Sequence, residues 1–240
     1  MSYAVETVNL GKKFIQHKKR ENNVVWAIKD VSIRINPGES LALLGPNASG
    51  KTTLLKLLAT LILPTEGRVY IDGYDILKCP GKTRRSIGLV VSGERSFYWR
   101  LTGRQNLDFF ASLYGLSRLQ IKKKIKALAE LLEVSSYLDY MFYEYSSGIK
   151  QRFSIARSLI HEPAIVLFDE PTKSLDASTA ENLLLFIKNK VLLEEKRTIL
   201  FTTHNYKEAV ILADKVVILQ DGRINSYNTP YELNNMQDNL

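Results

Sequence analysis

The chain has 240 residues, of which 45% are hydrophobic and 24% charged, which is ordinary for one globular domain at the upper end of the usual size range. No apolar run approaches the ~18 residues that a membrane-spanning helix needs, the first residues lack a signal-peptide pattern, and the single Cys79 excludes an internal disulfide, so we expect a cytoplasmic protein. The formal net charge of +8 is compatible with nucleic-acid binding or with a basic surface that faces a membrane or a nucleotide, and the scattered basic residues favour the second.

The N-terminal part of the chain predicts β-structure. Residues 5–10 and 31–35 alternate apolar with polar side chains, as half-buried strands do, and the polar residues 17–23 between them are expected to form a loop. The short apolar runs 40–44, 67–71 and 87–91 are typical of strands, and Pro80-Gly81 is expected to form a turn.

A helical region follows, and the α/β pattern then returns. Helical periodicity predicts helices over 106–114, 119–132 and 147–160. Later elements are a strand over 165–168, a helix over 177–193, a strand over 198–203, a helix over 206–213, and a hairpin of 215–220 with 223–227. We therefore expect a single domain over 1–240, in which 1–93 and 163–240 form an α/β core and 94–162 form a helical insertion.

Residues 45–52 fit the pattern G-x-x-x-x-G-K-[ST] of a phosphate-binding loop. Glycines let backbone N–H groups approach phosphate oxygens, Lys51 supplies a positive charge, and the Thr52 hydroxyl suits Mg²⁺. The loop follows a predicted strand and precedes a leucine-rich helix over 53–61, an order that aims the helix N-terminus at the phosphates. The candidate nucleotide-binding residues here are Gly45, Pro46, Asn47, Ala48, Ser49, Gly50, Lys51, Thr52 and Thr53.

Carboxylates and a histidine follow two later strands. Asp169 and Glu170 come directly after the apolar run 165–168, where Asp169 can hold Mg²⁺ and Glu170 can act as general base toward water. His204 ends the next strand and is expected to reach the terminal phosphate. Either feature alone is common in proteins without this chemistry, but the phosphate-binding loop makes the catalytic interpretation the stronger one.

The segment Tyr145-Ser146-Ser147-Gly148-Ile149 places small residues at the start of a predicted helix. Ser146 or Ser147 can cap that helix, and its free N–H groups would then form a second anion site. Physical grounds alone do not exclude the alternative, an ordinary capped helix.

Together these segments make the chain similar to the ATP-binding subunit of an ABC transporter over roughly residues 3–230. The resemblance implies a P-loop NTPase core with a mostly parallel sheet, an N-terminal antiparallel β subdomain and a helical insertion subdomain. It further implies these roles: Walker A for 45–52, signature for 145–149, Walker B for Asp169 and Glu170, D-loop for Ser174-Leu175-Asp176, switch histidine for His204, and adenine stacking for Phe14, with Tyr3 and Trp26 as competitors.

The sequence departs from the family pattern at two motifs. In the signature, Ser147 replaces the first glycine and Ile149 replaces glutamine, whereas Ser146 and Gly148, the positions expected to touch phosphate, are kept. The Q-loop glutamine is absent; direct alignment puts Ser92 there and a two-residue slip puts Glu94 there. We favour Glu94, because a carboxylate can coordinate Mg²⁺.

The resemblance implies ATP and Mg²⁺ as ligands and a head-to-tail dimer, with an identical or a related cassette, that closes on ATP and opens on hydrolysis. A transmembrane permease on a separate chain would hold the subunit at the cytoplasmic face of the membrane, and no nucleic-acid partner is expected. The alternatives are a soluble ABC-type ATPase without a transporter and a non-hydrolysing regulatory module.

The resemblance extends to a subtype. The stretch 93–107 and the Tyr-Ser-Ser-Gly signature are similar to ABC-2-type exporters, which implies export of a polysaccharide, a glycolipid or a drug. Within that stretch Phe97, Tyr98 and Trp99 are adjacent, so they cannot all enter one core. We expect this segment to dock the permease, although the rings could equally close the core between the two subdomains.

Overall fold

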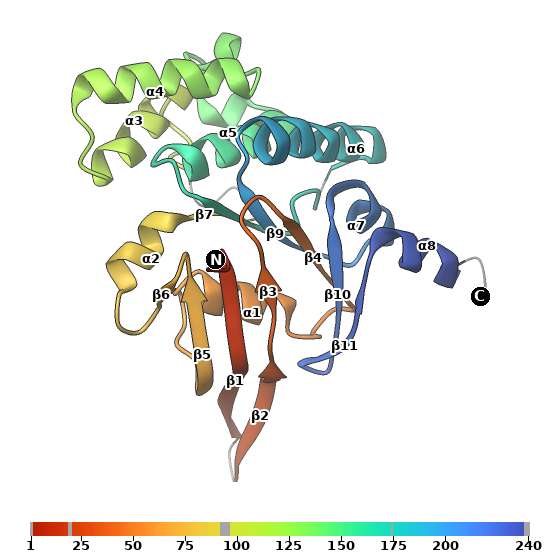
Figure 1. The fold of residues 1–240 in the computed structure, drawn as a ribbon. Helices are drawn as coiled ribbons and strands as arrows, with labels where there is room; N and C mark the ends of the chain where they lie inside the picture. Colours follow the sequence, from red (N-terminus) through yellow and green to blue (C-terminus); the bar gives the residue numbers. More distant parts are fainter. Residues whose placement is uncertain (1, 19–20, 92–96, 174, 238–240) are drawn as a thin grey trace.

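A six-stranded sheet forms the centre of the computed structural model, which describes residues 2–18, 21–91, 97–173 and 175–237 (Figure 1). Its order is β11-β10-β4-β9-β8-β7, and every neighbouring pair is parallel except β10 with β11. The strands are β4 (Ser40–Leu44), β7 (Ile87–Val91), β8 (Ile165–Asp169), β9 (Thr198–Thr203), β10 (Lys215–Gln220) and β11 (Arg223–Asn228).

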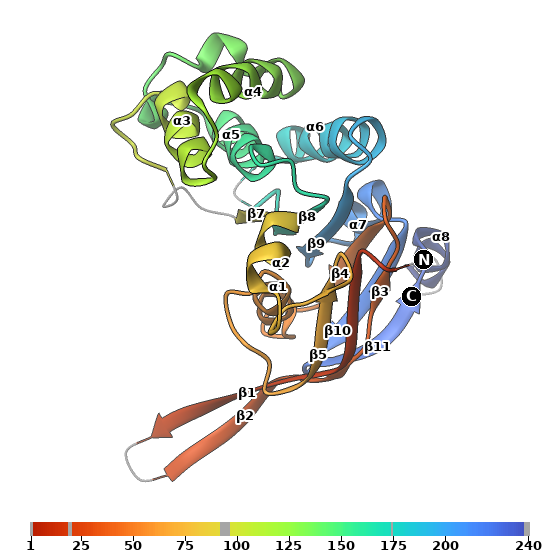
Figure 2. The same ribbon diagram turned by 60° about the vertical axis from the view of Figure 1, so that its left-hand side comes forward.

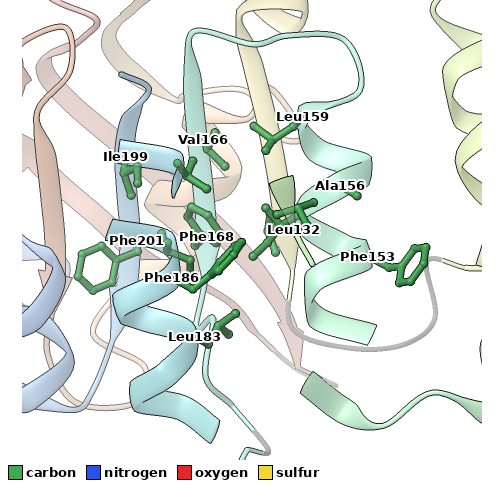
Figure 3. Packing of buried hydrophobic residues seen from close by; sticks show 14 of the residues in the cluster. Leu132, Phe153, Ala156, Leu159, Val166, Phe168, Leu183, Phe186, Ile199 and Phe201 are labelled. Carbon is green, nitrogen blue, oxygen red and sulfur yellow. The ribbon is translucent and has the colours of Figure 1, made fainter. Parts of the chain in front are cut away.

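The two faces of this sheet follow from strand alternation, because successive side chains point to opposite sides. Leu41, Leu43 and Leu167 face α1 (Lys51–Leu58) and the N-terminal strands, in one apolar cluster. Val166 and Phe168 belong to the other cluster, shared with the helices on the opposite side. Both faces are therefore covered, which explains why these strands read as continuous apolar runs. Figure 3 shows the second cluster, in which Phe168, Phe186 and Phe201 lie close together.

The N-terminal strands form a second sheet with order β2-β1-β5-β6, with β3 paired to β1. Its strands are β1 (Val5–Lys18), β2 (Glu21–Val31), β3 (Arg34–Ile35), β5 (Glu66–Ile71) and β6 (Tyr74–Asp75), and the pairings are antiparallel. The predicted loop over 17–23 is wrong: strand pairing continues to Lys18 opposite Glu21, and the β1–β2 hairpin projects from the body (Figure 2). Backbone pairing with the neighbouring strand outweighs the polar side chains there.

Helices gather above the sheet in a separate group (Figure 1): α3 (Gly103–Leu113), α4 (Arg118–Leu131) and α5 (Ser147–Leu159), with 3₁₀ turns at Ser135–Tyr137 and Phe142–Glu144. Capping boxes start α3 at Thr102 with Gln105 and α4 at Ser117 with Gln120, so the sequence itself sets where both helices begin. The predicted turn at Pro80-Gly81 is wrong, because Pro80 begins the short helix α2 (Pro80–Ser86). Proline is tolerated at that position, where its missing N–H has no partner to lose.

The C-terminal helices are α6 (Ala177–Phe186), which continues into a π-helical stretch over Ile187–Glu194, then α7 (Tyr206–Leu212) and α8 (Pro230–Gln237). Within the described residues, every helix is too short or too polar to cross a bilayer. A mostly parallel sheet, an antiparallel N-terminal sheet and a group of helices confirm the predicted fold class.

Candidate functional site

The loop between β4 and α1 carries the geometry that its glycines predict. Gly50 has φ 105° and Ala48 has φ 65°, both in the left-handed region. A Cβ on Gly45 would lie 2.2 Å from the carbonyl oxygen of Leu219, and one on Gly50 would lie 2.5 Å from that of Ala27. The loop is thus pressed against neighbouring backbone at both glycines, and a side chain at either would displace it.

Lys51 turns its ammonium into the loop. Its Nζ donates to the carbonyl oxygens of Gly45 at 2.7 Å and Pro46 at 2.9 Å, and the residue is only 5% exposed. Burial lowers the pKa of Lys51, and the nearby carboxylates of Glu170 and Asp169 oppose that effect. The loop therefore encloses a cation at the N-terminus of α1, where backbone N–H groups are free, and this is the arrangement of an anion site.

Asp169 connects this loop to the next two strands. Its Oδ1 accepts a hydrogen bond from Thr52 Oγ1 at 3.1 Å and one from Thr202 Oγ1 at 2.7 Å. The second bond follows from the register of β8 with β9, which sets Asp169 opposite Thr202. Thr52 and Asp169 offer hard oxygen donors side by side, which suits Mg²⁺. Among the described residues, no group of three or more His, Cys, Asp or Glu side chains could hold a metal ion.

Glu170 follows with an unusual backbone conformation, φ 48°. Its N–H donates to Thr202 Oγ1 at 3.0 Å, and its carboxylate pairs with Lys173 Nζ at 2.9 Å and lies 3.5 Å from Nδ1 of His204. The hydrogen bond from Lys173 is the main cause that lowers the pKa of Glu170. The carboxylate is thus held ionised, which is the state that can accept a proton from water.

The signature segment lies on a different element. Ser146 caps α5, with its hydroxyl accepting from Ile149 N at 3.4 Å, and a Cβ on Gly148 would lie 3.2 Å from Thr179 on α6. Among the described residues, no hydrogen bond joins Ser146, Ser147 or Gly148 to the loop over 45–52. This helix terminus is therefore not brought to the loop within one chain.

Tyr145 anchors the start of that segment. Its hydroxyl accepts from the N–H of Gly103 at 3.1 Å and contacts the carbonyl oxygens of Tyr140, at 3.1 Å, and Tyr137. The ring is 5% exposed and stacks on Phe153 with centroids 4.8 Å apart. The residue thus ties the entry of α5 to the first turn of α3.

Asp176 and Phe14, the first candidate for adenine stacking, are also on the surface. Asp176 caps α6 and accepts hydrogen bonds from Thr179 N at 3.0 Å and Thr179 Oγ1 at 2.6 Å. The bond from the Thr179 hydroxyl is the main cause that lowers the pKa of Asp176, and the backbone bond adds to it. Phe14 lies on the projecting hairpin with 41% exposure, whereas Trp26 and Tyr3 are half-buried. A cation lies over each of these rings: Lys13 Nζ is 4.0 Å from the Trp26 centroid, Lys12 Nζ 5.3 Å from that of Phe14, and Arg34 Cζ 5.1 Å from that of Tyr3.

Some candidate residues lie outside the part of the chain that the structure describes, and two residues that hold the site were not predicted. Glu94 and Ser92, the two candidates for the Q-loop position, lie outside the described residues, as does Ser174. Sequence reasoning gave no role to Thr202 or Lys173, which hold Asp169 and Glu170; the polar end of a buried strand was the available signal for Thr202.

The aromatic run is divided between core and surface. Phe97 is 6% exposed and stacks on Phe142 with centroids 4.3 Å apart, whereas Tyr98 and Trp99 are 51% and 45% exposed. Phe97 lies in the core, as one of the two interpretations held, whereas Tyr98 and Trp99 are partly exposed, with Lys150 Nζ 4.9 Å from the Trp99 centroid.

Comparisons with known proteins agree with this geometry. The ABC transporter family model matches residues 28–173. The chain is 39% identical over 209 residues to the ABC transporter ATP-binding protein NatA of Bacillus subtilis (strain 168), covering 87% of this chain and 83% of NatA. It is 37% identical over 209 residues to the carnitine transport ATP-binding protein OpuCA of Listeria monocytogenes, covering 86% of this chain but only 52% of that relative.

Solved structures give the same result. The chain matches cbiO1 from Clostridium perfringens, part of the ABC transporter complex cbiONQ, with a TM-score of 0.87 and 25% identity over 99% of this chain and 93% of that one. It matches the ATP-binding cassette MJ0796 in a dimeric post-hydrolysis state bound to ADP and Pi with a TM-score of 0.81 and 28% identity over 94% of this chain and 98% of that one. The chain therefore belongs to the ABC transporter family, as an ATP-binding and ATP-hydrolysing subunit.

Proposed function

We propose that this chain binds ATP with Mg²⁺ in the loop over 45–52 and hydrolyses it in a closed dimer to drive transport through a separate permease. The observation that carries the proposal is the convergence at one sheet edge of Lys51, Asp169 and Glu170. Thr52 and Thr202 link these groups, at 3.1 Å and 2.7 Å from Asp169 Oδ1. A buried cation after β4 and an ionised carboxylate after β8, on the two sides of β9, are what hydrolysis of a phosphoanhydride requires.

Each residue has a defined task in this proposal. Lys51 exchanges its bonds to the carbonyls of Gly45 and Pro46 for bonds to phosphate oxygens, while the N–H groups at the start of α1 hold the same anion. Thr52 and Asp169 would hold Mg²⁺, which when bound would supply positive charge beside the phosphates. Glu170 takes a proton from water, and His204, 3.5 Å from it, orients the water.

Dimerisation supplies what one chain lacks. Ser146, Ser147 and Gly148 stand at the exposed N-terminus of α5, and no hydrogen bond between described residues joins them to the loop of the same chain. We therefore assign them to the nucleotide of a second cassette, where they would donate to the anion and exclude water. MJ0796, of the same family, is known as a dimer.

The test of hydrolysis and closure is Glu170→Gln. The change keeps the side-chain shape but removes the base, so phosphate release should fall by about 10²- to 10⁴-fold. Because the triphosphate then persists, ATP should shift the variant to a dimer in size-exclusion chromatography.

The matched control is Glu130→Gln on the exposed face of α4, which should behave as the wild type. A Glu170→Gln variant that hydrolyses ATP at the wild-type rate, or that stays monomeric with ATP, would contradict the proposal.

A cavity of about 490 Å³ between α1, β7, α3 and α5 supports permease binding. Among its lining residues are Arg84, Phe110, Tyr114, Arg157 and His161. Aromatic rings together with arginine are typical of interface centres. Near the N-terminus of α3, the exposed Tyr98 and Trp99 extend the aromatic surface, and the Tyr98 ring packs against Phe109 at 5.0 Å.

The test of docking is Trp99→Ala in the chain co-expressed with its permease. The loss of an exposed ring at the interface should reduce recovery of the permease in detergent by about tenfold, a change of 1.4 kcal/mol, which is modest for an aromatic anchor. Tyr231→Ala, at a ring 74% exposed on α8, is the matched control. Full recovery of the permease with Trp99→Ala would exclude this surface as the docking site.

For direction and cargo we propose export of a polysaccharide, a glycolipid or a drug, from the cytoplasmic face of the membrane. Support comes from the stretch 93–107 and from the signature beginning at Tyr145. Relatives of this chain include proteins named for import, such as the glycerol-3-phosphate import protein UgpC, so direction needs its own assay. ATP-driven accumulation of substrate in inside-out vesicles would support export, and accumulation only in right-side-out vesicles would overturn it.

A further inference from the structure

Glu208 is a buried carboxylate that the proposed chemistry does not use. It is 8% exposed, at the start of α7. Its Oε1 accepts a hydrogen bond from the hydroxyl of Thr172, and its Oε2 accepts one from the hydroxyl of Thr203 at 2.6 Å. These two threonines stand at the ends of different strands: Thr172 lies beyond β8, two residues after Glu170, and Thr203 is the last residue of β9 and directly precedes His204. One carboxylate thus joins the two segments that carry Glu170 and His204.

The side chain has been diverted from the bond that its position in the helix favours. Asn205 is the N-cap of α7, so Glu208 stands at the third helical position, where a glutamate ordinarily accepts from the N–H of the N-cap residue. Here the N–H of Asn205 donates to Thr203 Oγ1 at 2.9 Å. Helix capping is therefore satisfied without Glu208, and its two oxygens remain for the threonines.

The loop that Glu208 braces is strained. Glu170 has φ 48°, a conformation that a residue with a side chain holds only when its surroundings fix it. Its N–H is held by Thr202, and its carbonyl accepts from Lys173 N at 3.0 Å. The hydroxyl of Thr172 is the next point of attachment along the chain, and Glu208 is its partner.

We propose that Glu208 is a positioning residue that holds Glu170 and His204 in their mutual geometry by clamping Thr172 and Thr203. This inference rests on the proposed function, in which those two groups act on water. It predicts that loss of the clamp slows hydrolysis without weakening ATP binding, because the two hydrogen bonds of Glu208 go to Thr172 and Thr203 and not to the loop over 45–52.

The experiment compares Glu208→Gln with Thr172→Val and Thr172→Ser. Displacement of a catalytic group by about 1 Å can cost on the order of 100-fold, so we expect kcat to fall by about 10- to 100-fold in Glu208→Gln and Thr172→Val, with KM for ATP unchanged within about twofold. Thr172→Ser keeps the hydroxyl and should restore kcat to within about threefold of the wild type. The double variant should be no slower than the slower single variant, because both remove the same link.

The matched control is Glu232→Gln. Glu232 occupies the same helical position on α8 but makes the ordinary capping bond, accepting from the N–H of Thr229 at 2.6 Å. Its kcat should equal that of the wild type. The inference would be overturned if both Glu208→Gln and Thr172→Val kept the wild-type kcat. It would also be overturned if Thr172→Ser lost as much kcat as Thr172→Val, or if the variants raised only KM for ATP.

Hydrogen exchange separates this inference from the proposed function. Glu208→Gln and Thr172→Val should speed exchange of the amides of Glu170 and Lys173 by about tenfold or more, whereas Glu232→Gln should not. That readout needs no activity. A wild-type chain without ATPase activity would count against the proposed function alone, and unchanged exchange in both clamp variants would overturn the clamp.

Discussion

Replacing Tyr145 by phenylalanine tests how the signature helix is anchored. The hydroxyl accepts from Gly103 N at 3.1 Å and contacts the carbonyls of Tyr137 and Tyr140, while the ring remains packed on Phe153 in the variant. Gly103 N also donates to the carbonyl of Tyr140 at 3.2 Å, so the change leaves no orphaned donor. The cost is therefore that of losing hydrogen bonds at a site only 5% exposed, about 1–2 kcal/mol of unfolding free energy.

Urea unfolding at neutral pH measures this cost. The control is Tyr231→Phe, whose ring is 74% exposed and whose free energy of unfolding should stay within about 0.5 kcal/mol of the wild type. Tyr145→Leu should cost about 2–4 kcal/mol because the stacked ring is also lost. A Tyr145→Phe variant as stable as the wild type would refute the claim that this hydroxyl anchors α5.

Alkaline unfolding gives an independent check on Tyr145. Burial raises its pKa from 10.0 to about 12, so the folded state favours the neutral phenol. Stability from this group is full below pH 10 and is lost as pH rises through about 12, by at most about 3 kcal/mol. The stability advantage of the wild type over Tyr145→Phe should therefore shrink across that range. Tyr227, whose pKa burial also raises to about 12, is common to both proteins and cancels.

Three further predictions concern the core, the phosphate-binding loop and a half-buried histidine. Phe168→Ala should cost about 3–5 kcal/mol in denaturant unfolding, because the ring is fully buried, and a loss under about 1 kcal/mol would contradict the packing. Gly50→Ala should weaken nucleotide binding by about tenfold or more in a fluorescence titration, because its φ of 105° and the 2.5 Å approach to Ala27 leave no room for a Cβ; unchanged affinity would mean that the loop adapts. Burial lowers the pKa of His161 below 6.5, so its contribution to stability is full above that pH and is lost as pH falls toward the lower folded-state value. His161→Gln should therefore reduce the fall in melting temperature between about pH 7.5 and about pH 5.5. A fall identical to that of the wild type would contradict the assignment.

The sequence was sufficient to predict those parts of the fold whose signals lie within one short stretch of residues. The strand, glycine-rich loop and helix around Lys51 were predicted because apolar runs and the loop glycines lie next to one another in sequence. The position of Asp169 and Glu170 at a strand end followed for the same reason. Their proximity to Lys51 needed the strand order, which the family resemblance implied.

Contacts that depend on register could not be predicted in this way. Thr202 holds Asp169 because β8 and β9 align these residues, and no short stretch of sequence records that alignment. The β1–β2 hairpin was missed for a related reason, since pairing between Lys18 and Glu21 is a property of two strands and not of one. The roles of the site residues, including the dimer contacts of Ser146 and Gly148, stay predictions.

Lys51 keeps its charge compensated by the loop itself, through the carbonyls of Gly45 and Pro46. The loop can therefore retain its shape between turnovers, with its own oxygens standing in for those of a departing product. An incoming nucleotide then replaces the carbonyls as the partner of Lys51 in a loop that is already ordered. Little conformational entropy is therefore lost when it binds. The groups that hold the lysine in this way are backbone oxygens, which no sequence pattern records.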